Sequence, residues 1–312
     1  MPVINHFNNF KRMKTIEYIS VKLLFFIFSR ISLKSGKRFA GLLTILVEKV
    51  IRYRRDVILS NLHLVYGEQL PRPEKQFLHD IYKNFIYLWM EFLQINHFTP
   101  RTLDELMRFK NPEVLAQLKR ENKGVLFVSG HFGNFEWLGQ AMVIQGWPIW
   151  AIAKKQSNQK VDQFITQIRS RFGMKIVYTK KAMQVCERAL KQKEAVAIAF
   201  DQDARKRGVF VNFLGQPSST AVGTAVLHLR TGADIVLLIA LRKDYAKFDV
   251  YAKKIELPVK TGNLQDDVTA ITQKVSSEFE KWVREYPEQW FWMHRRWKTR
   301  PASVSSSSQG VN

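Results

Sequence analysis

The sequence predicts an α/β protein with a mostly parallel central sheet flanked by helices. From residue 124 onward, short apolar runs alternate with stretches of about ten residues that have helical spacing. The runs are continuously apolar, which is typical of strands covered by helices on both faces. The 312 residues, 46% of them hydrophobic, supply enough apolar surface for such a core.

Before the first strand, residues 56–110 are predicted to be helical, because residues such as Phe77, Ile81 and Phe85 recur at helical spacing. The expected order after them is strand 124–129, helix 134–145, strand 148–153, helix 161–172, strand 175–178, helix 182–191, strand 195–200, polar loop 201–218, helix 220–231, strands 234–242 and 248–253, and helix 264–285. Residues 56–300 would form the main domain. The serine-rich tail 301–312 is predicted to be disordered.

Residues 1–55 are both apolar and strongly basic. Two apolar stretches, 16–33 and 39–51, are each interrupted by charges, and the segment holds twelve basic residues against two acidic ones. We expect a helical membrane anchor with its basic flanks on the cytoplasmic side, either spanning the bilayer or lying in its interface. A signal peptide is disfavoured, because no small-residue cleavage site follows. A soluble helical pair folded on the core is the alternative.

The charge balance favours anionic partners. The chain has 49 Lys and Arg against 27 Asp and Glu, a formal charge of +22, which suits nucleic acid, an anionic bilayer or a phosphorylated substrate. Near the end, Trp282, Trp290, Trp292 and Trp297 alternate with Arg and Lys, a composition that suits a bilayer headgroup layer or base stacking. The single cysteine, Cys186, lies in a helical apolar pattern that indicates packing.

The segment Ser129-Gly-His131-Phe-Gly-Asn134-Phe-Glu136 lies where the first strand of the sheet gives way to a helix. Ligands of open α/β sheets bind at that edge. With His131 in the turn and Glu136 in the first helical turn, the two side chains can converge, so that a carboxylate fixes the imidazole tautomer and the other nitrogen serves as a base. The helix start offers free N–H groups to an oxyanion or phosphate. A capping or packing histidine remains the alternative.

Other catalytic motifs are missing from the sequence. It contains no Gly-x-Ser-x-Gly, no Walker loop, no His-Glu-x-x-His and no Cys-x-x-Cys. The remaining histidines have no metal-ligand spacing, so we expect no metal.

Several motifs in order resemble the bacterial late acyltransferases of lipid A biosynthesis, the lauroyl/myristoyl transferase family of the lysophospholipid-acyltransferase-like superfamily. The resemblance covers about residues 15–301. It is carried by Arg54-Arg55 with Asn61-Leu62, the segment from Ser129 to Glu136, Asn158 with Arg169, Asp201-Gln-Asp203, Gly208-Val-Phe-Val-Asn-Phe-Leu-Gly215, Thr220 with Gly223, Thr231-Gly-Ala233, Pro287-Glu-Gln-Trp290 and His294-Arg-Arg-Trp-Lys298. Asn212 stands where proline is expected, which affects no catalytic position.

This resemblance implies transfer of an acyl chain from acyl carrier protein to a hydroxyl of the Kdo-bearing lipid A precursor, with no cofactor besides the donor. His131 would deprotonate the hydroxyl, and Glu136 would orient and charge-stabilise His131. The hydroxyl would then attack the thioester directly, without an acyl-enzyme. The implied surroundings are a glycolipid acceptor, membrane lipids and the bacterial inner membrane, with the active site on the cytoplasmic side. We expect a monomer and no nucleic-acid partner.

Four further residues are expected to bind substrate: Asn134, Arg169, Asp201 and Gln202. Arg169 would contact a phosphate or an oxyanion, with a solvated arginine on the helix face as the alternative. Asp201 and Gln202, at the end of another strand, would shape the same site. Asp203 is expected to pair with the adjacent cations 205–207. These cations and those at 154–155 could face the acceptor's phosphates and acidic sugars, although a solvated side chain is favoured for any one of them.

Two alternatives remain open. The acceptor could be another glycolipid, such as a phosphatidylinositol mannoside, or a lysophospholipid. A non-enzymatic nucleic-acid-binding protein is the alternative of a different class, and it predicts strongly salt-dependent binding of oligonucleotides.

Overall fold

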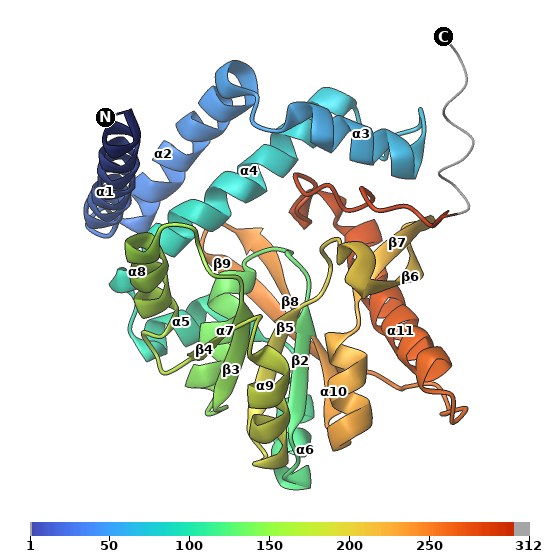
Figure 1. Cartoon of the computed structure of the whole chain (residues 1–312). Coiled ribbons are helices and arrows are strands. Elements are labelled where there is room, and N and C mark those ends of the chain that lie inside the picture. The colour runs from blue at the N-terminus through green and yellow to red at the C-terminus, as the bar shows by residue number, and fades with distance from the viewer. Residues whose placement is uncertain (1, 303–312) are drawn as a thin grey trace.

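The computed structural model of the chain describes residues 2–302, with side chains from residue 13 onward. A seven-stranded sheet lies at its centre, in the order β1-β9-β8-β2-β5-β3-β4, and helices cover both faces (Figure 1). β1 and β9 run antiparallel to the other strands, which are parallel to one another. The strands are β1 (Met107–Phe109), β2 (Val125–Ser129), β3 (Ile149–Ala153), β4 (Lys175–Tyr178), β5 (Ala195–Ala199), β8 (Asp234–Asp244) and β9 (Lys247–Lys254).

The helices form two layers around this sheet. α7 and α8 follow β2 and β3 on one face, and α9, α10 and α11 pack together on the other. The helices are α1 (Pro2–Phe28), α2 (Leu33–Leu46), α3 (Arg55–Tyr66), α4 (Glu74–Leu93), α5 (Pro100–Leu106), α6 (Pro112–Glu121), α7 (Phe135–Ile144), α8 (Gln159–Arg169), α9 (Ala182–Lys191), α10 (Gly223–Thr231) and α11 (Leu264–Glu285). Short helical turns are η1 (Val47–Ile51), η2 (Ile95–His97), η3 (Arg205–Arg207) and η4 (Pro287–Gln289).

The predicted α/β architecture is confirmed, with two differences in detail. The expected polar loop 201–218 contains most of a hairpin, β6 (Gly208–Phe213) and β7 (Gln216–Ala221), so that the next helix begins only at residue 223. The hairpin was predicted to be a loop because its residues are polar. Ser218, Ser219 and Thr220 are nevertheless buried, since their hydroxyls donate to main-chain carbonyls. The edge strand β1 was also missed, since three residues carry too little pattern.

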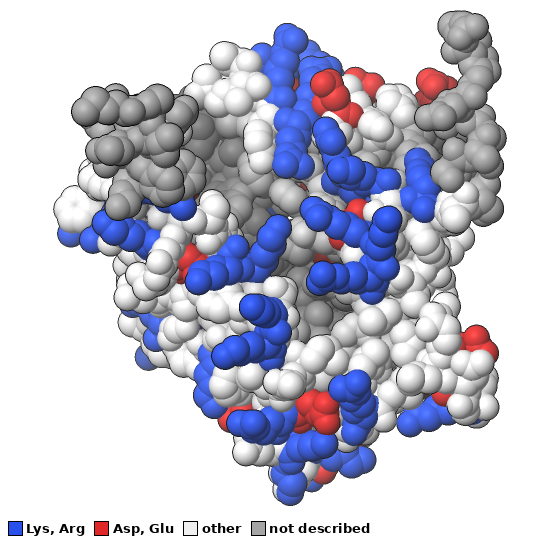
Figure 2. Space-filling model, in the orientation of Figure 1, with Lys and Arg blue, Asp and Glu red and all other residues white. Residues whose placement is uncertain are grey.

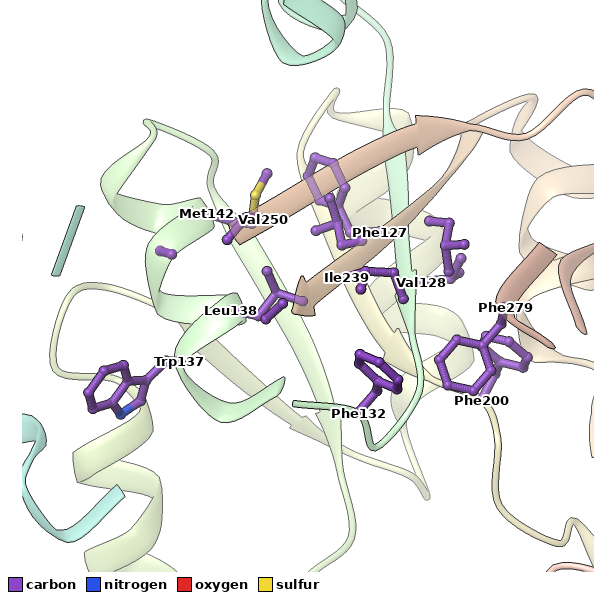
Figure 3. Close-up of a cluster of buried hydrophobic side chains, with 14 of the residues drawn as sticks. Phe127, Val128, Phe132, Trp137, Leu138, Met142, Phe200, Ile239, Val250 and Phe279 are labelled. Atoms are coloured by element: carbon purple, nitrogen blue, oxygen red, sulfur yellow. The ribbon is translucent and has the colours of Figure 1, made fainter. Parts of the chain in front are cut away.

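Aromatic and aliphatic side chains of three layers fill the core (Figure 3). Phe127 and Val128 of β2 and Leu138 and Met142 of α7 are buried in one core, and Phe279 of α11 packs edge-on against Phe132 and Phe200. Gly130 lies under this ring: a Cβ there would be 2.0 Å from the Phe279 ring, so only glycine allows the contact. The turn after β2 is therefore tied to the core.

The two N-terminal helices lie at one corner of the molecule, against α8 and α4 (Figure 1). Tyr18 and Phe25 of α1 pack edge-on against Phe164 of α8. Among residues 2–302, no helix combines the length and apolarity needed to cross a membrane, so a spanning anchor is not supported. These helices and η1 nevertheless expose many large hydrophobic side chains: Met13, Ile16, Ile19, Leu23, Leu24, Phe26, Ile27, Phe39, Leu42, Ile45, Leu46, Val50 and Ile51.

The tryptophans near the C-terminus lie inside the protein. Trp290, Trp292 and Trp297 are 3%, 0% and 4% exposed, and their rings pack against one another. Arg296, between them in the chain, is buried as well. The interpretation of this cluster as a headgroup or base-stacking surface is therefore wrong for these residues, because their rings fill the core beside α3 and β6–β7. Residues 303–312 of the predicted disordered tail lie outside the described residues.

Candidate active site

Two neighbouring parallel strands bring the central residues of the site together. β2 and β5 pair in a register that sets Ser129 opposite Ala199. Two residues after Ser129 and Ala199 come His131 and Asp201. His131 Nδ1 lies 2.7 Å from Asp201 Oδ1, and the His131 amide donates to Asp201 Oδ2 at 2.8 Å. The carboxyl ends of the two strands thus form a histidine–aspartate pair at the sheet edge where α/β proteins bind ligands.

The turn that carries His131 requires a second glycine. Gly133 has φ of +54°, and a Cβ there would lie 1.8 Å from the carbonyl oxygen of Ala240. Asn134 then begins α7, its side-chain oxygen accepting from the Trp137 amide at 2.9 Å. This local chemistry sets the imidazole at the helix entrance.

The partners of the imidazole define its tautomer. Asp201 is a carboxylate acceptor, so Nδ1 carries the proton, and Nε2 accepts from the amide of Gln202 at 3.1 Å. Burial lowers the pKa of His131, but the charge and hydrogen bond of Asp201, with the charge of Glu136, outweigh it and raise the pKa above 6.5. Burial likewise opposes ionisation of Asp201, yet the His131 and Trp290 contacts hold the pKa of Asp201 at about 2.

Glu136 does not occupy the place expected of it. Its carboxylate receives a bidentate pair from Arg169, with Nε to Oε2 at 2.9 Å and Nη2 to Oε1 at 2.5 Å. The orienting hydrogen bond on His131 comes from Asp201 instead, because the helix carries Glu136 toward α8 while β5 delivers Asp201 to the imidazole. Glu136 acts on His131 through its charge alone. Arg169, expected to be free for an anion, is half-buried and already paired with this carboxylate.

Asn134 also differs from expectation. Besides capping α7, it donates from Nδ2 to Glu91 Oε2 at 2.8 Å, and the residue is fully buried. Glu91 of α4 in turn accepts from the Ala246 amide and from Arg242 of β8. The side chain of Asn134 therefore joins the start of α7 to a buried ion pair and does not reach a substrate.

A cavity of about 340 Å³ opens beside the imidazole. His131, Gln202, Glu136, Arg169 and Lys154 line its polar mouth. Below them the walls are apolar and continue between α7 and the sheet; they include Phe127, Leu138, Gly139, Met142, Ile149, Met174, Ile176 and Leu238. Along β3, from Ala153 at the mouth to Ile149 below, the cavity extends about 13 Å at ~3.3 Å per residue.

Five cations follow β3 and β5, two of the strands that line the cavity. Lys154 and Lys155 follow β3, and Arg205, Lys206 and Arg207 form η3; none of the five forms an ion pair with another described residue. The expected pairing of Asp203 with η3 is wrong, because its carboxylate accepts from the Arg205 amide and the Thr299 hydroxyl. Figure 2 shows Lys and Arg gathered around a hollow in the middle of this face.

The single cysteine is not placed to act as a nucleophile. Cys186 is buried as predicted, and burial raises the pKa of its thiol to about 11, far above the range in which a thiolate forms at neutral pH. In the part of the chain that the structure describes, no group of three His, Cys, Asp or Glu side chains could hold a metal ion.

Sequence reasoning missed the direct contact of Asp201 with His131 and the third donor to that carboxylate. Trp290 Nε1 donates to Asp201 Oδ2 at 2.8 Å from the buried C-terminal cluster. The available signal was the position of Asp201 at a strand end, which placed it at the site without revealing its partner.

A histidine base beside an apolar cavity, with no metal cluster among the described residues, suits an enzyme that moves an acyl chain between two substrates. Comparison with known families supports that class: residues 11–299 match the family described as bacterial lipid A biosynthesis acyltransferase. The chain belongs to this family and is an O-acyltransferase.

Similar proteins include enzymes with different acyl chains and acceptors. The lipid A biosynthesis palmitoleoyltransferase of Escherichia coli is 29% identical over 264 residues, 82% of each chain. The lauroyltransferase of the same organism is 27% identical over 263 residues, 83% of each chain. A phosphatidylinositol mannoside acyltransferase of Mycobacterium tuberculosis is 24% identical over 179 residues, 56% of this chain and 54% of that protein.

Proposed function

We propose that this protein transfers a fatty acyl chain from acyl carrier protein to a hydroxyl of the Kdo-bearing lipid A precursor. The observation that carries the proposal is the imidazole of His131, held by Asp201, with Nε2 at the mouth of a deep apolar cavity. Family membership and the two Escherichia coli relatives, named for lipid A biosynthesis, support this acceptor class.

In the proposed reaction, Nε2 of His131 takes the proton of the acceptor hydroxyl. The oxygen attacks the thioester carbonyl, forming the ester C–O bond as the C–S bond breaks, and the proton passes to the leaving sulfur. Asp201 stabilises the imidazolium that forms in between. Gln202, which donates to Nε2 in the resting site, yields this nitrogen to the hydroxyl. The free N–H groups at the start of α7 would supply partial positive charge to the oxyanion, whereas the charge of Arg169 is already balanced by Glu136.

We assign the apolar cavity to the acyl chain. The thioester would lie at the polar mouth, and the hydrocarbon would extend between α7 and β3 toward Met142 and Met174. Gly139 of α7 lies close to Met174, since a Cβ there would be 2.9 Å from Sδ of Met174. These residues should therefore set the length of chain that fits.

Replacing Gly139 with leucine should shorten the accepted acyl chain. The new side chain projects into the cavity against Met174, so kcat/KM for the longest accepted chain should fall at least about tenfold relative to a shorter one. Competing acyl carrier protein donors of different length, with product masses read by mass spectrometry, give this ratio.

The matched variant is Gly139→Leu combined with Met174→Ala, which frees space for the leucine. It should restore transfer of the longer chain. Equal losses for all chain lengths in both variants would mean that the cavity does not hold the acyl chain.

The cations around the mouth fit both substrates in charge. Lys154, Lys155 and η3 are available to the phosphates and acidic sugars of the acceptor. Acyl carrier proteins are acidic, so the same surface would also steer the donor toward His131.

We further propose that the apolar outer surface of α1, α2 and η1 lies in the interface of the bacterial inner membrane, with the active site on the cytoplasmic side. Thirteen large hydrophobic side chains are exposed there. The positive charge of residues 1–55 supports attachment to anionic lipid. A concentration of exposed apolar side chains on one part of a surface marks a site of interaction with a membrane or a protein.

Replacing Leu42 with glutamate should weaken vesicle binding. Leu42 is 68% exposed on α2, and losing one buried apolar side chain should lower the partition coefficient onto phosphatidylglycerol-containing vesicles at least about tenfold. The control is Leu264→Glu, at the start of α11, where the leucine is 67% exposed but lies outside the N-terminal surface. Equal sedimentation of both variants with vesicles would rule out this membrane face.

The proposed activity is tested by incubating detergent-purified protein with acyl carrier proteins of several acyl lengths and the Kdo-bearing precursor. Mass spectrometry should show the precursor heavier by one acyl group and the carrier returned with a free thiol. A phosphatidylinositol mannoside is the second acceptor to include, because relatives named for it align over about half of this chain. Product with the mannoside alone would replace the proposed acceptor while leaving the reaction class intact.

A further inference from the structure

We infer that Trp290 is a positioning residue, whose indole holds Asp201 against His131, and that residues 289–296 form a clamp between the two loops of the active site. This inference rests on the proposed role of His131 as the base. It also assigns a role to the buried aromatic cluster, which neither the acyl cavity nor the membrane surface explains.

Trp290 completes the hydrogen bonding of the Asp201 carboxylate. Oδ1 accepts from Nδ1 of His131, while Oδ2 accepts from the His131 amide and from Nε1 of Trp290, both at 2.8 Å. Three fixed donors leave the buried carboxylate one orientation, and a carboxylate that cannot turn fixes the imidazole in turn.

The clamp is bonded to the His131 loop along its main chain. Gly133 donates to the carbonyl of Gln289 at 3.0 Å, and Phe291 donates to the carbonyl of His131 at 3.0 Å. Phe132 and Trp290 form an antiparallel bridge between these bonds. The loop that bears the base is therefore held from its outer side by the end of the chain.

The other edge of the clamp holds the loop after β5. The Asp203 amide donates to Nε2 of His294 at 3.0 Å, two residues beyond Asp201. Arg296 donates to the carbonyl of Ser219 and to the hydroxyl of Thr220 in β7, while it remains 1% exposed. The clamp joins segments near residues 131, 203 and 220 that would otherwise be free to shift separately.

α3 keeps the clamp in place. Asn61 donates from Nδ2 to the carbonyls of Trp292 and His294, both at 2.8 Å, and Arg54 donates to the carbonyl of Met293 at 3.1 Å. Arg54 and Asn61, which belong to the sequence motif near the N-terminus, thus contact the active site through the clamp.

The test compares Trp290→Phe with Trp292→Phe. Both tryptophans are buried in the same cluster, and both indoles donate one hydrogen bond, but that of Trp292 goes to the Pro287 carbonyl. Phenylalanine keeps most of the packing and removes the donor in each case. We expect similar losses in melting temperature for both, but a fall in kcat of about tenfold, with KM little changed, for Trp290→Phe alone.

The second readout is the pKa of His131, measured by NMR titration of histidine-labelled protein, with His131→Asn used to assign the signal. The charged and titratable groups facing this imidazole are Asp201, Glu136, Arg169 and His294. Without the Trp290 donor, Asp201 is held less firmly against the imidazole, and its charge and hydrogen bond raise the pKa of His131 less. The pKa of His131 should therefore fall, and the acidic limb of kcat should move to lower pH with it. Trp292→Phe should leave both at the wild-type position.

The outcomes separate this inference from the proposed function. If the His131 pKa moves in Trp290→Phe while wild-type protein transfers no acyl chain, the positioning role stands and the proposed reaction fails. If wild-type protein is active and the two tryptophan variants share one pH profile and one His131 pKa, Trp290 only packs and the inference is overturned.

Discussion

Replacing His131 with asparagine is expected to lower kcat for acyl transfer by about 10²–10⁴-fold, the usual contribution of a general base. Asparagine can still donate to Asp201, so the loop should keep its shape while the acceptor hydroxyl loses its base. Product formation by mass spectrometry gives the rate, and circular dichroism monitors the fold.

His228→Asn is the matched control. This histidine contacts a main-chain carbonyl, that of Ala233 at 2.8 Å, and lies on α10 away from the cavity. It should retain wild-type kcat. Undiminished transfer by the His131 variant would exclude the imidazole as the base.

The pH dependence follows from the same contact. Only the neutral imidazole accepts a proton, so kcat/KM should rise with pH through the pKa of His131, which lies above 6.5 because the Asp201 charge and hydrogen bond outweigh burial. In Asp201→Asn the carboxylate that raises the pKa of His131 is lost, while the burial that lowers this pKa remains. The acidic limb of kcat/KM should therefore move to lower pH. The maximal rate should fall as well, because the asparagine amide no longer stabilises the imidazolium.

Replacing Glu91 with glutamine is expected to destabilise the protein by about 3–5 kcal/mol, the cost of leaving a buried charge without its partner. Glu91 is fully buried and pairs with Arg242, whose side chain is 6% exposed. Glutamine preserves the shape and an acceptor for Asn134 but leaves the guanidinium uncompensated. Denaturant unfolding of the detergent-purified protein measures the loss.

Two comparisons isolate the ion pair. Glu91→Gln combined with Arg242→Met removes both charges while glutamine keeps an acceptor for Asn134, so this double variant should recover much of the stability lost in Glu91→Gln. Glu105→Gln breaks the exposed Arg101–Glu105 pair of α5 and should cost no more than about 0.5 kcal/mol. If the double variant is no more stable than Glu91→Gln, the buried charge is not the cause.

Local patterns predicted most of the fold correctly. Each strand from β2 to β5, and each helix between them, could be predicted from a segment of about ten residues. An apolar run and a helical spacing are properties of residues that are close in the sequence. The hairpin β6–β7 was not predicted, because its burial depends on contacts with distant residues. Ser218, Ser219 and Thr220 are polar yet buried, and only their hydrogen bonds within the folded chain make that possible.

In the candidate site, too, local features were predicted from the sequence and contacts between distant residues were not. His131 and its glycines stand in one strand-turn-helix segment, so their chemistry was visible from the sequence. The spacing of Glu136 suggested a pair with His131, but the first turn of α7 points that carboxylate at Arg169. The tryptophans near the C-terminus were wrongly predicted to lie on the surface, because the composition that suits a membrane surface also suits an aromatic core.

By itself, the sequence determined that an α/β protein carries a histidine at a strand end, together with a large excess of cations. Only the tertiary structure decided which carboxylate meets that histidine. Asp201 lies 70 residues away, and the order β2-β5-β3 in the sheet makes it the neighbour. Strand order and the path of the last residues are set by the packing of the whole core, which no short stretch of sequence encodes.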